Sequence, residues 1–182
     1  MPDLTGKTVA FLVATEGIEQ AELTSPWHAV QDAGGTPRLV STEPGKVQAF
    51  EHLDIADTFE VDDTVASADA ADYDALVLPG GVANPDALRT DAGAVAFAKA
   101  FFDGGKPVAA ICHAPWTLVE ADVVRGRRMT SWPSLQTDLR NAGAEWVDEP
   151  VVVDEGANTL ITSRKPDDLD AFNEALLAAL AQ

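Results

Sequence analysis

The sequence has little positive charge and little cysteine, and both shortages restrict what the chain can do. Its 182 residues carry 30 acidic against 12 basic side chains, which gives a formal net charge of −18. Such a surface repels nucleic acids and anionic membranes, so we expect neither as a partner. Acidity of this kind is typical of a well-solvated surface, and the alternative is that it attracts a cationic substrate.

The single cysteine, Cys112, cannot form an internal disulfide, and the chain has only three histidines. No Cys or His pair has the spacing of a zinc site, so we expect neither a disulfide scaffold nor a metal. The first residues, MPDLTGKTVAFLV, contain one lysine and a short apolar run, which matches neither a signal peptide nor a membrane span. We therefore expect a reducing, cytoplasmic location and one domain that covers residues 1–182.

Short apolar runs alternate with helical patterns along the chain. The aliphatic and β-branched runs predict strands at 7–14, 36–42, 75–79, 106–111 and 128–132. Apolar spacing and glycine stops predict helices at 24–34, 85–103, 113–124, 134–143 and 167–182. Residues 43–74 have weak periodicity and predict irregular strands and turns, and 144–163 predict paired strands around the turn EGAN. This alternation predicts an α/β fold, a mostly parallel sheet with helices on both faces.

Pro26 decides where the first helix is expected to begin. A proline is tolerated in the first turn of a helix, so we expect the helix to start near Thr24 or Ser25. Residues 15–23 would then form a loop after the first strand. Three glutamates, at positions 16, 19 and 22, crowd this loop, and as a solvated face they need no special explanation.

Cys112 lies between the apolar run KPVAAI and the start of the next helix. Reacting groups in open α/β sheets gather at the carboxyl ends of strands. Small residues two before and two after the cysteine, Ala110 and Ala114, suit the strained strand-to-helix turn called a nucleophile elbow. A helix N-terminus would lower the pKa of the thiol. We predict a nucleophile, and the alternative is a buried cysteine that packs as a small hydrophobe.

Other polar candidates near this turn are few. His113 follows the cysteine directly, whereas we expect His28 and His52 to be ordinary surface or core histidines. No histidine follows His113, so a triad that takes its histidine from late in the chain has no donor. The glycines of LPGG, Gly80 and Gly81, could direct backbone N–H groups at an oxyanion or could form a simple turn.

These motifs together resemble the PfpI family, the intracellular protease and general stress protein branch of the superfamily that includes the Parkinsonism-associated deglycase. The resemblance covers nearly the whole chain. Its segments are EQAELTSP, LPGG followed by NPD, AICHAPW, TSWPSL, NAGAEWVDEPVVVD and TSRKPDDL. LPGG and AICHAP are its most specific parts. The resemblance implies a flavodoxin-like three-layer sandwich of the class I glutamine amidotransferase type.

The resemblance also implies site residues. Cys112 would be the nucleophile, His113 the adjacent base and Glu19 the acid beside the sulfur, protonated when the thiol is ionised. Gly80 and Gly81 would lie near the oxyanion, with Ala114 at a position where the family usually has glycine. Asp86 would orient His113 of a neighbouring subunit, which implies a homodimer or a higher homo-oligomer with a shared active site; the alternative is that Asp86 caps its own helix.

Three functions remain open from the sequence. The first is a cofactor-independent cysteine enzyme of glyoxalase or deglycase type that acts on reactive carbonyls, free or as protein adducts, in stress protection. The second is a cysteine peptidase that uses the same residues. The third is a redox-sensing or holding protein in which Cys112 is oxidised reversibly and turns nothing over.

Overall fold

Seven strands form the central sheet in the computed structural model, which describes residues 2–182. They run in the order β11-β12-β8-β7-β1-β3-β6, and all neighbours pair parallel except β11 with β12. Their bounds are β1 Thr8–Val13, β3 Thr36–Ser41, β6 Asp63–Thr64, β7 Ala75–Leu78, β8 Val108–Ile111, β11 Val151–Glu155 and β12 Thr159–Ser163. The four residues of β7 and the four of β8 are all buried, as expected for strands covered on both faces.

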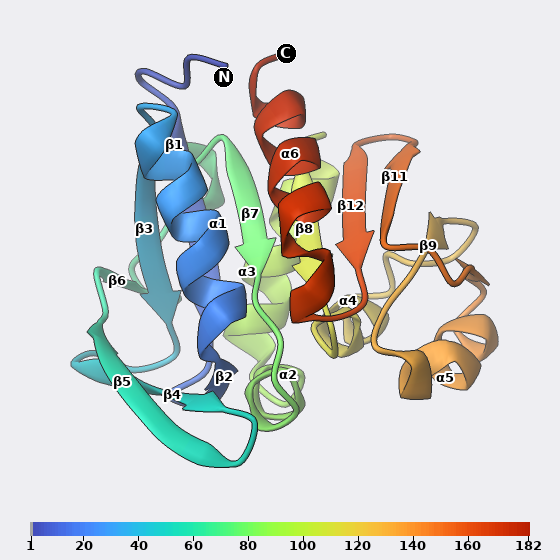
Figure 1. The fold of residues 1–182 in the computed structure, drawn as a ribbon, viewed down its shortest axis with the longest axis horizontal. Helices are drawn as coiled ribbons and strands as arrows, with labels where there is room; N and C mark the ends of the chain where they lie inside the picture. Colours follow the sequence, from blue (N-terminus) through green and yellow to red (C-terminus); the bar gives the residue numbers. More distant parts are fainter. Residues whose placement is uncertain (1) are drawn as a thin grey trace.

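Helices cover both faces of this sheet, which confirms the predicted α/β architecture (Figure 1). Helices α1 (Gln20–Asp32) and α6 (Leu169–Leu180) pack against each other on one face, with α3 (Ala92–Asp103) on the opposite face. The shorter helices are α2 Ala83–Leu88, α4 Pro115–Glu120 and α5 Gln136–Asn141, and single 3₁₀ turns occupy Ala70–Asp72, Pro133–Leu135 and Pro166–Asp168. No helix within residues 2–182 combines the length and the apolar character that crossing a bilayer requires.

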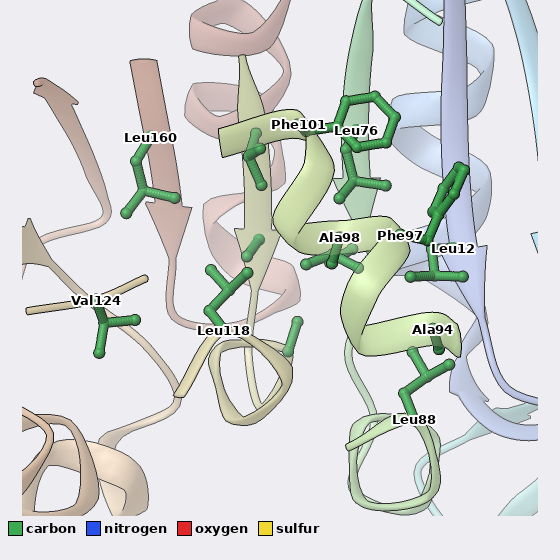
Figure 2. Packing of buried hydrophobic residues seen from close by; sticks show 14 of the residues in the cluster. Leu12, Leu76, Leu88, Ala94, Phe97, Ala98, Phe101, Leu118, Val124 and Leu160 are labelled. Carbon is green, nitrogen blue, oxygen red and sulfur yellow. The ribbon is translucent and has the colours of Figure 1, made fainter. Parts of the chain in front are cut away.

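The core has one apolar cluster on each side of the sheet. On the α3 side, Phe97, Ala98 and Phe101 point from one stripe of the helix toward Leu12 and Leu76 of the sheet (Figure 2). The two phenylalanine rings meet edge to face with centroids 5.2 Å apart, a geometry that stabilises the core beyond the effect of their burial. This buried stripe anchors α3 to the strands that carry the site, whereas Val95 and Phe102, which the apolar spacing also favoured, are only half-buried.

The first helix begins earlier than predicted, because Pro26 lies inside α1 rather than in its first turn. A proline there removes the hydrogen bond to the carbonyl of Glu22. Burial of Leu23, Pro26 and Val30 against the sheet offsets this loss. The consequence for the site is large, because Glu22 becomes a helical residue on the inward face instead of a loop residue.

The region expected to be irregular contains an ordered hairpin. Strands β4 (Lys46–Glu51) and β5 (Asp54–Glu60) pair antiparallel, and β2 (Glu16–Glu19) joins them as a third strand. Four of the seven residues of β5 are exposed Asp, Glu or Thr, so apolar periodicity could not reveal the strand. The hairpin lies at the end of the sheet where β1 leads into β2 (Figure 1).

Two more predicted elements are shorter than expected. The helix expected over 85–103 is divided into α2 and α3, because Asp91 caps α3 by accepting the N–H of Ala94 at 2.8 Å. The strand expected over 128–132 is reduced to β9 (Arg128–Met129), which pairs with β10 (Glu145–Trp146). The paired strands around EGAN are confirmed as β11 and β12.

The loops that follow β1, β7 and β8 meet at one end of the sheet, because these strands are parallel neighbours. Asn84, which is fully buried, braces two of them. Its side chain accepts the N–H of Ala14 at 2.7 Å and donates to the carbonyls of Pro79 and Gly80 at 2.9 and 3.0 Å. This brings the glutamates after β1 next to the glycines after β7.

Candidate active site

Cys112 occupies a strained turn between β8 and α4. Its φ of 64° is one of three positive values among the non-glycine residues of 2–182, and a side chain in this region costs free energy. Backbone hydrogen bonds hold the turn: the N–H of Cys112 donates to Ser163 at 3.1 Å, and its carbonyl accepts the N–H of Trp132 at 2.8 Å. The geometry is that of a nucleophile elbow.

Glu22, and not Glu19, is the acid beside the sulfur. The carboxyl of Glu22 is fully buried and lies within hydrogen-bonding reach of the Cys112 thiol. Its Oε2 accepts the N–H of Gly80 at 2.9 Å, and its Oε1 has no partner among the nitrogen and oxygen atoms of residues 2–182. Glu19 is the residue just before α1, and its Oε2 instead accepts the N–H of His52 at 3.1 Å. The early start of α1 is the physical reason for this correction.

Burial governs the charge of this pair. Burial and, to a smaller extent, the nearby charge of Glu19 raise the pKa of Glu22 to about 8, against the hydrogen bond from Gly80. At neutral pH Glu22 is therefore protonated. A neutral carboxyl can donate a hydrogen bond to sulfur, and it adds no repulsive charge when the thiolate forms.

The pKa of the Cys112 thiol is raised, whereas the prediction for a helix N-terminus was that it is lowered. Burial and the neighbouring Glu22 raise the pKa of Cys112, whereas the N–H groups of Gly81 and His113 act in the opposite direction. Helix α4 begins only at Pro115 and has six residues, so its dipole is short and starts beyond the cysteine. The predicted lowering by the helix is wrong, and ionisation of Cys112 depends on the protonation of Glu22.

His113 contacts the sulfur directly through Nδ1, which lies 3.1 Å from Sγ. Burial lowers its pKa, so the imidazole is largely neutral at pH 7 and can accept a proton. The ring stacks on Trp132 at 5.5 Å between centroids and meets the edge of Trp116 at 5.2 Å. Two tryptophans therefore fix its orientation, and no hydrogen bond to Nε2 comes from residues 2–182.

The glycines of LPGG have separate roles. The N–H of Gly80 is committed to Glu22, so it cannot also bind an oxyanion, while the N–H of Gly81 faces the sulfur. A Cβ added at Gly80 would meet Glu22 Oε2 and lie 2.6 Å from Cβ of Cys112. Gly81 has a φ of 82°, and a Cβ there would meet the carbonyl of Gly17. The close approach of the three loops thus requires these residues.

Ala114 does not belong to the binding surface that was predicted for it. Its N–H donates to the carbonyl of Ile111 at 3.1 Å, and its side chain is buried in the α3-side core. The residue lies past the elbow, where the chain turns inward to begin α4. The backbone donors near the sulfur are instead those of Gly81 and His113.

A cavity of about 450 Å³ opens above the sulfur. Its size suits a small ligand. It is lined by Gly17, Glu19, Glu22, Phe50, His52, Leu53, Gly81, Val82, Ala83, Cys112, His113, Trp132 and Pro166. Among residues 2–182 no group of three or more His, Cys, Asp or Glu side chains could hold a metal ion.

The structure also adds residues that the sequence analysis did not select. Phe50, His52 and Leu53 come from the β4–β5 hairpin and form one wall of the cavity, and Trp132 forms another. His52 has a φ of 57°, a conformation that few side chains adopt. Asp86, by contrast, lies exposed on α2, outside the residues that line the cavity.

Several named proteins are similar to this chain in sequence or in fold. Over 174 residues, 96% of this chain and 98% of theirs, the chain is 41% identical to YraA of Bacillus subtilis, a suspected cysteine protease, and to protein/nucleic acid deglycase 2 of Escherichia coli. It is 41% identical over 175 residues, with the same coverage, to general stress protein 18 of Bacillus subtilis.

A solved two-domain protein from Anabaena variabilis, with DJ-1/ThiJ/PfpI-like and ferritin-like domains, superposes with a TM-score of 0.88 at 35% identity. The match covers 96% of this chain and 48% of that one. DJ-1β of Drosophila melanogaster superposes with a TM-score of 0.84 at 28% identity, over 96% and 90% of the two chains. The DJ-1/PfpI family model matches residues 7–179, and the chain therefore belongs to the DJ-1/PfpI family.

Proposed function

We propose that this chain is a cofactor-independent cysteine enzyme that converts reactive α-oxoaldehydes, free or as early adducts on amines, to hydroxy acids. The observation that carries the proposal is the position of Cys112. Its sulfur lies at a strained elbow on a small-molecule cavity, between a protonated carboxyl and a neutral imidazole. The deglycase name of a relative at 41% identity supports the same chemistry.

The first step forms a carbon–sulfur bond. His113 takes the thiol proton through Nδ1, and the sulfur attacks the aldehyde carbon of methylglyoxal. The carbonyl oxygen gains negative charge, which the N–H groups of Gly81 and His113 stabilise before it takes a proton. The product is a hemithioacetal on Cys112, with all atoms of the aldehyde retained.

The second step moves hydrogen within the bound substrate. A base removes the proton from the carbon attached to sulfur, and the resulting enediol takes a proton at the neighbouring carbon, which leaves a thioester. Glu22 and His113 are the groups within reach of the sulfur that can hold these protons. Water then hydrolyses the thioester to lactate and the free thiol, so the sum is methylglyoxal plus water to lactate.

An adduct on an amine enters the same sequence. Its carbon bears a hydroxyl and the amine nitrogen, and the amine leaves with a proton as the sulfur bonds to that carbon. The sum is then adduct plus water to free amine plus lactate. The enzyme would thus remove early glycation from proteins, which fits the stress-protein name of a relative.

A peptidase remains the second candidate, because one relative carries a protease name. Acyl transfer would use the same sulfur, base and N–H groups. The cavity volume of about 450 Å³ suits a small compound better than an extended peptide. This size is the reason for preferring the carbonyl substrate.

The proposal includes a shared site in a homo-oligomer. Among residues 2–182 no acidic side chain contacts His113, and two exposed apolar side chains line the cavity: Leu53 is 94% exposed and Val82 is 56% exposed. A second copy that covered these residues could bring Asp86 to the imidazole. Asp86 on exposed α2 is available for such a contact.

The deciding experiment is steady-state conversion of methylglyoxal, and of its adduct with Nα-acetylarginine, followed by lactate formation with a Cys112→Ala control. Turnover that the control abolishes supports the proposal. Cleavage of casein without lactate formation would favour the peptidase. Reversible oxidation of Cys112 by peroxide with no turnover of either class would favour a redox sensor.

A further inference from the structure

The cavity above Cys112 has an unbalanced charge. Two of its lining residues are glutamates, and none of those within residues 2–182 is lysine or arginine. Glu22 is neutral at pH 7, because its pKa is raised to about 8 by burial. Glu19 is the remaining acid on the wall; it is half exposed, and among residues 2–182 its carboxylate is hydrogen-bonded only to the backbone N–H of His52. A single carboxylate therefore faces an incoming ligand without a fixed counter-charge.

The basic side chains nearest to the cavity along the chain are already paired. Arg164 and Lys165 precede Pro166, which lines the cavity. Arg164 binds Asp168 at 2.9 Å and Asp148 at 2.8 Å, and Lys165 lies 3.3 Å from Asp167. Neither cation is left to neutralise Glu19.

The charge of Glu19 acts inside the cavity, because it helps to raise the pKa of the buried Glu22. The N–H of Glu19 also donates to the carbonyl of Gly80 at 3.4 Å, next to Gly81, whose N–H faces the sulfur. The bond to His52 holds the carboxylate between β2 and the hairpin wall. Coulomb attraction at such a partly buried position is stronger than on an open surface.

We infer that Glu19 selects substrates by charge, so that the cavity accepts carbonyl compounds that carry a cationic group and disfavours those that carry phosphate or carboxylate groups. Substrates of the first kind are α-oxoaldehyde adducts of arginine, whose guanidinium keeps its positive charge. Those of the second kind are adducts of nucleotides. As a statement about substrates, this inference rests on the proposed function, but the charge selection itself does not require turnover.

The single cysteine allows a direct test, because every thiol reagent reports on Cys112 alone. Rates of modification are measured with the cationic aminoethyl and the anionic sulfonatoethyl methanethiosulfonates, each divided by its rate with 2-mercaptoethanol. Wild-type protein should favour the cation about tenfold or more, and Glu19→Gln should reduce this preference about fivefold. The glutamine keeps an acceptor for the His52 N–H, so the wall remains in place.

Glu16→Gln is the matched control, since Glu16 is exposed on the same strand and does not line the cavity. It removes one negative charge from the chain and should leave the preference unchanged. Equal preferences in wild type and Glu19→Gln, or an equal loss in both variants, would overturn the inference. A preference for the cationic reagent that is reduced in Glu19→Gln and unchanged in Glu16→Gln would support the inference.

The substrate arm uses the methylglyoxal adducts of Nα-acetylarginine amide and of GMP. The ratio of their kcat/KM values should fall about fivefold in Glu19→Gln, because intrinsic reactivity cancels between the two proteins. If neither adduct is turned over but the reagents still discriminate by charge, the proposed function fails and charge selection stands. If both are turned over with an unchanged ratio, the proposed function stands and charge selection fails.

Discussion

The carboxyl of Glu22 lies against the thiol of Cys112, and both side chains are almost completely withdrawn from solvent: Glu22 is 0% and Cys112 is 6% exposed. They come from different parts of the sequence, the first turn of α1 and the turn after β8. Buried in one place, two acidic groups cannot both ionise without a large electrostatic cost. Much of the chemistry of the site follows from which of them keeps the proton.

Glu22 should matter more for turnover than Glu19. Replacing Glu22 with glutamine keeps the bond to Gly80 possible but removes a group that can move a proton, so kcat for methylglyoxal should fall about 10²- to 10⁴-fold. Glu19→Gln, the matched variant at the cavity wall, should reduce kcat less than tenfold. Lactate production at saturating substrate measures both. A larger loss in Glu19→Gln would restore the residue that the family resemblance first suggested.

The pH dependence of alkylation should reveal the proton on Glu22. Below pH 8 the carboxyl is neutral and donates to sulfur, as a glutamine also can, so iodoacetamide rates of wild type and Glu22→Gln should agree within about threefold. Above pH 8 the wild-type carboxylate repels a thiolate and the glutamine does not. The variant should then react faster. Curves that separate below pH 7 and converge above pH 9 would contradict this order of ionisation.

Stability should depend on pH through the same group. The folded-state pKa of Glu22, about 8, lies above the ordinary value of 4.5, so the folded protein holds a proton that the unfolded chain releases. The contribution of Glu22 is complete below pH 4.5 and is lost as the pH rises toward 8. Each pKa unit between the two values corresponds to about 1.4 kcal/mol.

Denaturant unfolding of wild type and Glu22→Gln at several pH values isolates this effect. The free energy of unfolding of wild type minus that of the variant should decrease between pH 5 and 8. Subtraction removes the opposite contribution of His113, whose lowered pKa makes stability rise with pH. A difference that stays flat over this range would mean that Glu22 ionises normally in the folded protein.

Buried strands and the elbow were predictable because their signals are local. Runs such as ALVL and VAAI are apolar at every position, and only a strand covered on both faces needs such a pattern. The placement of Cys112 at the end of one of them follows from the order of the residues alone. The family resemblance added LPGG to the predicted site. LPGG lies close to the cysteine because β7 and β8 are adjacent strands.

The choice among the three glutamates was not predictable in the same way. It depends on whether α1 starts at Gln20 or after Thr24, and Pro26 favours the later start if only local rules are applied. Tertiary burial of Leu23 and Pro26 overrides that preference. The β4–β5 hairpin escaped prediction for a related reason, since its exposed polar strand has no apolar face to read. Both misses fall on the walls of the cavity.

The last prediction concerns the partner of His113. Nδ1 of the ring faces the sulfur at 3.1 Å, and two tryptophans hold the ring, so Nε2 is left for a group outside these contacts. A base at an active site works best when a third group orients it and stabilises its cation. We expect Asp86 of a second copy to supply that group, because it is exposed on α2 beside an exposed apolar mouth.

Mixing two inactive variants tests this expectation. Cys112→Ser lacks the nucleophile and Asp86→Ala lacks the orienting carboxylate, so each should be inactive alone. In a mixed pair, one chain supplies the thiol and the other the carboxylate, which restores one complete site of two. Equal mixing with free exchange should therefore recover about a quarter of wild-type activity, since half the pairs are mixed and each has one good site. Asp86→Glu, which keeps the charge, is the control that should remain active. Asp86 does not cap its helix, because α2 begins at Ala83 and has no side-chain cap. A chain that stays monomeric at micromolar concentration, or mixed chains that recover nothing after confirmed exchange, would therefore leave Asp86 as an exposed acid in the first turn of α2 and His113 without a partner in trans.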